Sequence, residues 1–192
     1  GRARWYVLHA VANIAIGLIS LPDLVTSLRA PCRCFTGEYA LLPVYLIAAI
    51  HLYHMLAFKC NASDYFHHLV FGGLICPMGM FFVTGPVQNL VAFFICGVPG
   101  GLDYAMLALV KMRRMSTLTE KVWNARINVW IRSPGLLLAA FCCLLGRFDA
   151  HAPAAMQAAV GGSPEVNLSS VGGGADTAWT VQLYSKHDAL CG

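Results

Sequence analysis

The sequence predicts an all-α protein: a polytopic membrane bundle of about five transmembrane helices followed by a disordered C-terminal tail. Of the 192 residues, 58% are hydrophobic and only 11% are charged, and the mean hydropathy is +0.63. A soluble domain carries roughly 25% charged residues. Too few charged side chains therefore remain to cover a water-facing surface. The chain also contains five apolar stretches that approach the roughly 20 residues a helix needs to cross a bilayer.

The five predicted spans are separated by short polar connections. Pro22 and Asp23 are expected to end the first span, because proline removes a helix hydrogen bond and clashes with the preceding turn. The glycines and proline between Gly97 and Gly101 are expected to kink or break the fourth span. The predicted spans are residues 5–21, 38–58, 65–83, 87–110 and 130–145.

Basic residues predict the orientation of these spans, since cytoplasmic loops are enriched in Lys and Arg. The segment 111–126 carries five basic residues against the single acidic Glu120, so it is expected to be a cytoplasmic loop. The amino end with Arg2 and Arg4, and the short connection with Lys59, are expected on the same side.

The composition divides the chain into a bundle over residues 1–147 and a tail over residues 148–192. The tail is rich in Gly, Ala and Ser and shows no helical or strand period, so it is expected to be mostly disordered. The formal charge of +4 does not predict nucleic-acid binding, because the basic residues form no continuous face. Since the chain begins at Gly1, further residues are expected upstream.

Five of the seven histidines fall in the apolar part, where ionisable groups are costly: His9, His51, His54, His67 and His68. One interpretation is general-base chemistry at His67 or His68, with Asp64 one helical turn away to orient a ring. A second is structural, with histidines bridging helices by hydrogen bonds. A third is metal ligation by His51, His54, His67 and His68, as in membrane di-iron hydroxylases. That class needs about eight histidine ligands, so it ranks last.

Asp103 is a carboxylate inside an apolar segment, directly after the predicted break. It is expected either to line a polar pocket between helices or to cap the helix that restarts there, and the two roles are compatible.

Four segments resemble the TLC domain family of multi-spanning, lipid-related membrane proteins, which includes the ceramide synthases. They are RWYVLHAVANIAIGLISLPDLV at 4–25, NASDYFHHLV at 61–70, GVPGGLDYAMLALVK at 97–111 and NVWIRSPGLL at 128–137. The resemblance spans residues 5–141. It implies a bundle of membrane helices in the endoplasmic reticulum or another internal membrane.

The resemblance also implies a site. A paired histidine and downstream acidic residues are the signature of the ceramide synthases, and His67, His68 and Asp103 match the pair and one aspartate. Met106 and Leu107 stand where the synthases have a second aspartate and a glutamate. The chain therefore departs from the synthase pattern.

Three functions follow as hypotheses. The first is lipid metabolism or homeostasis through acyl transfer, without a bound cofactor and with acyl-CoA as a candidate substrate. The second is non-catalytic binding of membrane lipids or of protein partners in the membrane. The third is the di-iron hydroxylase.

Overall fold

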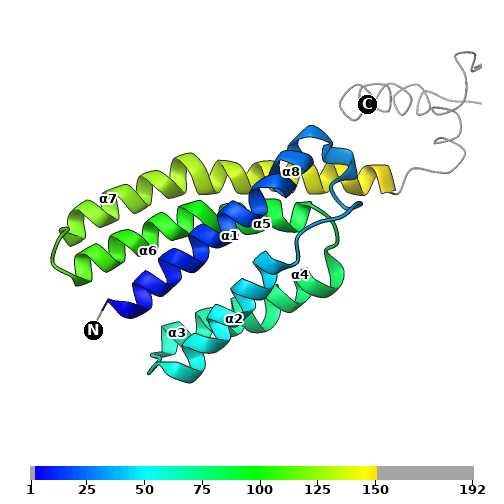
Figure 1. Ribbon diagram of the computed structural model, residues 1–192. Helices are drawn as coiled ribbons and strands as arrows, with labels where there is room; N and C mark the ends of the chain where they lie inside the picture. The colour runs from blue at the N-terminus through cyan, green and yellow to red at the C-terminus, as the bar shows by residue number, and fades with distance from the viewer. Residues whose placement is uncertain (1–2, 151–192) are drawn as a thin grey trace, which may run out of the picture.

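The computed structural model describes residues 3–150, and every regular element in this range is helical. The chain runs back and forth in five passes that lie side by side (Figure 1). This confirms the predicted all-α bundle. The elements are α1 (Arg4–Arg29), the 3₁₀ turn η1 (Pro31–Arg33), α2 (Leu42–Ala57), α3 (Ala62–His68), the π-helical turn η2 (Leu69–Ile75), α4 (Cys76–Phe82), α5 (Val87–Ile95), α6 (Gly97–Lys111), α7 (Thr117–Ile127), the π-helical turn η3 (Asn128–Arg132) and α8 (Ser133–Ala150).

Four helical stretches are long and apolar enough, by length and composition, to cross a membrane. They are Arg4–Arg29, Ala62–Phe82, Val87–Lys111 and Thr117–Gly146, of 26, 21, 25 and 30 residues. The remaining pass, α2, is apolar but has only 16 residues. The π-helical turns continue the third and fifth passes rather than interrupt them.

The predicted end of the first span at Leu21 is wrong, since α1 continues through Pro22 to Arg29. Pro22 removes only one backbone donor, and the following turn is held by packing. Asp23, Leu24 and Ser27 are all buried against the bundle. Tertiary contacts therefore extend the helix beyond its proline.

The predicted start of the second span at residue 38 is also wrong, because α2 begins at Leu42. The preceding segment is held in a non-helical conformation by two side chains. Asp23 Oδ2 accepts a hydrogen bond from Ala40 N at 3.0 Å, and Asn89 Nδ2 donates to Ala40 O at 2.7 Å. Asn89 Nδ2 also donates to Asp23 Oδ2 at 2.5 Å. These bonds join α1, the connection before α2, and α5.

The interruption of the fourth span lies at Cys96, one residue before the predicted glycine and proline break. Residues Gly97–Lys111 form α6, so the glycines are helical. Pro99 lies in the first turn of α6, where a missing backbone donor costs little.

The predicted loop over residues 111–126 is wrong as well, because most of it is helix. α7 begins at Thr117, capped by Ser116, whose Oγ accepts from Thr119 N at 3.0 Å. The fifth pass is therefore far longer than predicted. The start of α1, the α2–α3 connection and the α6–α7 turn lie at one end of the bundle (Figure 1). Which membrane face this end occupies stays a prediction. The predicted tail, apart from the last residues of α8, lies outside the described residues.

At the opposite end, the connection after α1 is anchored on α8. Cys34 is buried, and its thiol donates to Cys142 O at 3.3 Å. Burial and the neighbouring Cys143 and Cys142 raise the pKa of Cys34 to about 12, so its thiol stays protonated at neutral pH. Cys34 thus belongs to an apolar core with Leu24, Val87 and Leu90.

Small residues set the distance between α1 and α6. A Cβ atom on Gly17 would lie 2.9 Å from Val98 N, and one on Gly101 would lie 2.6 Å from Ile14 Cγ1. A Cβ on Gly97 would lie 3.0 Å from the Cα of Gly17. Such contacts are typical of membrane helices that pack backbone against backbone.

Gly17→Ala should therefore destabilise the bundle by about 1–3 kcal/mol, because its Cβ would meet backbone atoms that cannot rotate away. Gly73→Ala is the matched control, since its Cβ would meet only the flexible end of Leu69 at 3.5 Å. Thermal unfolding in detergent should show a lower midpoint for Gly17→Ala alone. Equal midpoints would contradict the close packing of α1 on α6.

Candidate functional site

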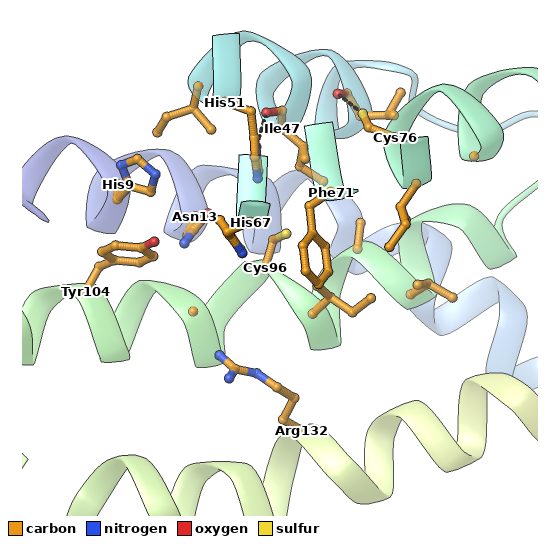
Figure 2. A pocket seen from close by; sticks show the side chains of 18 of the residues that line it. His9, Asn13, Ile47, His51, His67, Phe71, Cys76, Cys96, Tyr104 and Arg132 are labelled. Carbon is orange, nitrogen blue, oxygen red and sulfur yellow. Dashed lines mark hydrogen bonds between the residues drawn. The ribbon is translucent and has the colours of Figure 1, made fainter. Parts of the chain in front are cut away.

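All five passes contribute to a cavity of about 460 Å³. Figure 2 shows His9, Asn13 and Tyr104 toward one end, Phe71 and Cys76 toward the other, and His51 and His67 between them. The polar lining residues are His9, Asn13, His51, His67, Gln88, Asp103, Tyr104 and Arg132. The apolar lining includes Ile47, Ile50, Phe71, Ile75, Val91, Ile95 and Leu136. Polar side chains thus gather at the end with His9, Asn13 and Tyr104, whereas the end with Phe71 and Cys76 is mainly apolar.

His51 of α2 is buried and its ring has a defined tautomer. Its Nδ1 lies 2.7 Å from Ile47 O, one turn earlier in α2. Because a carbonyl oxygen can only accept, Nδ1 carries the proton and Nε2 bears the lone pair. This Nε2 is buried and has no hydrogen-bond partner among the described residues.

The adjacent histidines of α3 occupy different environments. His67 is exposed and lines the cavity. His68 is 2% exposed and lies behind it, with Nε2 at 2.6 Å from Nδ1 of His54. Its other nitrogen, Nδ1, is buried without a hydrogen-bond partner in the described chain. The ring centroid of His51 lies 5.5 Å from that of His67 and 5.0 Å from that of His68.

At the polar end of the cavity, the ring of His9 in α1 packs against two other aromatic rings. Its centroid lies 3.4 Å from that of Trp5 and 4.4 Å from that of Tyr104. The Trp5 ring also lies 3.5 Å from that of His54, centroid to centroid. The five membrane histidines, widely separated in the sequence, are therefore brought into one neighbourhood.

Asp103 lies inside α6, so the interpretation as a helix cap is wrong. It is half-buried, lines the cavity, and its Oδ1 accepts from Asn124 Nδ2 at 2.8 Å. The structure therefore brings His67 and Asp103 to one cavity. Their catalytic roles stay predictions.

Asp64 has a local role at the start of α3. Its Oδ2 accepts from Asn61 N at 3.0 Å, and Asn61 Oδ1 accepts from Asp64 N at 2.9 Å, a reciprocal capping box. Neither Asp64 nor His68 lines the cavity. The predicted use of Asp64 to orient a catalytic ring stays a prediction.

Sequence reasoning missed a polar ladder on the fifth pass. Glu120, Asn124, Asn128 and Arg132 are spaced four residues apart, and Asp103 joins them from α6. Asn128 Nδ2 donates to Asn124 Oδ1 at 2.6 Å, and Arg132 Nη1 donates to Asn128 Oδ1 at 2.6 Å. The four-residue period was the available signal. The predicted loop over residues 111–126 concealed this period, because only a helix places residues four apart on one face.

The ladder ends at the cavity with Arg132. Figure 2 shows this side chain reaching from η3 toward the cavity. Its Nη1 is paired, but its Nε is buried without a hydrogen-bond partner among residues 3–150. A guanidinium with a free buried donor suits an anionic oxygen.

Together these features define a polytopic helical membrane protein with a histidine-lined cavity between its passes. No protein-family model, no curated protein and no solved structure matches the chain.

The hydrogen bonds of the ladder are expected to stabilise the bundle, which a substitution of Asn124 can test. Asn124→Leu removes the donor to Asp103 and the acceptor of Asn128, and because these groups are only partly buried, each one left unpaired should cost about 1 kcal/mol, at the low end of the range for buried groups. The unfolding midpoint in detergent should fall clearly. Leu118→Ala, on the exposed face of α7, is the control and should leave the midpoint unchanged. A midpoint for Asn124→Leu equal to that of the control would refute the ladder.

Proposed function

We propose that this protein binds a membrane lipid, with the headgroup at the polar end of the cavity and hydrocarbon along its apolar wall. The observation that carries the proposal is the two-sided lining of one cavity inside a membrane bundle. A volume of about 460 Å³ lies within the range of about 300–1,000 Å³ that is usual for small-molecule sites.

The polar end favours a headgroup with an anionic oxygen. Arg132 offers a buried donor that no described residue accepts. Asn13 and Tyr104 line the same cavity and add neutral hydrogen-bonding groups. A phosphate or a carboxylate would pair with Arg132, and Asp103 would favour a headgroup that also carries a cation.

We place the chain in the TLC domain family as part of this proposal. The support is the resemblance of the four segments described above, which contribute to α1, α3, α6 and the η3–α8 region around the cavity. An internal membrane such as the endoplasmic reticulum is the proposed location, and membrane lipids are the proposed partners.

The test is photo-crosslinking with a lipid that carries a photoreactive acyl chain, in nanodiscs of phosphatidylcholine and phosphatidic acid. Crosslinks should map to cavity-lining residues such as Ile50 and Phe71. Ile47→Trp would fill the cavity from α2 and should lower crosslinking at those residues several-fold. Leu52→Trp, on the exposed face of the same helix, is the matched control. Crosslinks confined to exposed residues, unchanged in Ile47→Trp, would refute lipid binding in the cavity.

A second candidate function is acyl transfer, favoured by His67 and Asp103 on the wall of the same cavity. His67 would take the proton from the hydroxyl or amine of a long-chain acceptor as that group attacks the acyl-CoA carbonyl. The carbon–sulfur bond would then break, and the proton would pass to the departing thiolate. Asp103 is a candidate to stabilise the imidazolium from across the cavity.

Catalysis and binding are separated by an assay of the purified protein with acyl-CoA and long-chain base, lysolipid or phosphoglycerol acceptors. His67→Ala should abolish turnover while lipid crosslinking persists. His68→Ala should preserve part of the turnover, because His68 lies behind the cavity. The absence of acyl transfer to every acceptor would leave lipid binding as the function of the cavity and exclude this second candidate.

A further inference from the structure

We propose that His51, His67 and His68 form a binding site for a divalent transition-metal ion of the zinc type, with an open coordination position facing the cavity. The inference goes beyond lipid binding and stands without it. One ligand nitrogen from each of the three histidines lies within 4.8 Å of the others. They come from two helices, α2 and α3, that the tertiary fold brings together.

The two buried members of this set have unused nitrogens. His51 is 8% exposed and His68 is 2% exposed, and neither His51 Nε2 nor His68 Nδ1 has a hydrogen-bond partner among the described residues. A buried polar atom without a partner costs about 1–3 kcal/mol, so such atoms are rare in native proteins. A metal ion would use both lone pairs at once.

The opposite nitrogen of each of these two rings already has a hydrogen-bond partner, which is a backbone carbonyl for His51, as is usual for a metal-ligating histidine, and the imidazole of His54 for His68. His51 Nδ1 donates to Ile47 O at 2.7 Å, which leaves Nε2 free to ligate. His68 Nε2 lies 2.6 Å from His54 Nδ1, and in the tautomer in which His68 donates, its Nδ1 bears the lone pair. Ligating histidines nearly always donate their second N–H to such an acceptor, which orients the ring and raises its basicity.

His67 supplies the third ligand from the cavity side. Its ring stacks on that of His51 at 29° between planes. Zinc–nitrogen bonds of about 2.0–2.1 Å place ligand nitrogens roughly 3.3 Å apart, so modest rotations of exposed His67 would close the site. His51 and His67 both line the cavity, as Figure 2 shows. The fourth position would therefore face the space where a ligand or water can enter.

A neighbouring set, His54, Cys60 and Asp64, also has its ligand atoms within 4.8 Å. Its members already have partners: His54 Nδ1 contacts His68, and Asp64 Oδ2 accepts from Asn61 N at 3.0 Å. This set is therefore accounted for by local structure. It serves as the competing outcome in the test.

The experiment uses the full chain in detergent, stripped with a chelator and then exposed to Zn²⁺. After desalting, elemental analysis should find about one zinc per chain. His51→Gln, His67→Gln and His68→Gln should each weaken zinc binding at least about tenfold. His9→Gln is the matched control, because His9 lines the cavity but lies outside the ligand set, and it should bind zinc as the wild type does.

A measurement on the wild-type protein makes the test independent of how the variants fold. Co²⁺ should produce the visible absorption of a low-symmetry nitrogen site, and Zn²⁺ should displace it. The proposal is wrong if neither metal is retained, or if the three Gln variants bind as the wild type does. It is also wrong if Cys60→Ser abolishes binding, because the metal would then belong to the neighbouring set. A bound metal would occupy the lone pair of His67, so acyl transfer with His67 as base would require the metal-free protein.

Discussion

The close packing of α1 on α6 is the constraint on which the rest of the bundle depends. Gly17 and Gly97 face each other with no room for a Cβ, and Gly101 approaches Ile14 equally closely. Hydrophobic burial does not drive helices together in lipid, so such contacts depend on dispersion between closely approaching backbones. The same approach brings His9 and Asn13 of α1 opposite Tyr104 of α6. The polar end of the cavity therefore follows from the glycines.

Many polar groups inside the bundle find partners within it, and several of those that do not belong to residues at the cavity. In a membrane, every polar group must find a partner within the protein. Asp23 and Asn89 meet this rule by tying α1, Ala40 and α5 together. Asp103 meets it through Asn124 on α7. The unpaired atoms of His51 and Arg132 belong to residues that line the cavity, and that of His68 belongs to a ring beside His51, so a bound group would complete them. Ser20, Ser27 and the amide oxygen of Asn89 are also buried without a partner among the described residues, away from the cavity.

The proposals for lipid and metal rest on different atoms of this cavity. Arg132 and the hydrocarbon wall support an amphiphile, whereas the histidines of α2 and α3 support a metal ion. The two sites adjoin, since His51 and His67 line the cavity that Arg132 enters. A headgroup oxygen at Arg132 would therefore lie in the same cavity as the open coordination position.

Composition and hydropathy alone determined the fold class, because a chain with 11% charged residues cannot cover a water-facing surface. Length and apolar runs also located the five passes, although the ends of the first, second and fifth passes were misplaced. Pro22 does not end α1, and Asp23, predicted to end the first span with it, is a buried acceptor for Asn89. The partner of Asp23 lies far along the chain, so no local pattern could identify it.

The candidate site was likewise predicted in part from the sequence and in part decided by the tertiary structure. From the sequence, the membrane histidines and Asp103 were predicted to have a role, because ionisable side chains in apolar segments are energetically costly. Only the tertiary structure separated adjacent His67 and His68, placing one on the cavity and the other against His54. It also placed Arg132, to which the sequence analysis gave no role, at the end of a hydrogen-bonded ladder. Residue types determine which groups need partners in a membrane, whereas the partners themselves depend on which helices pack together.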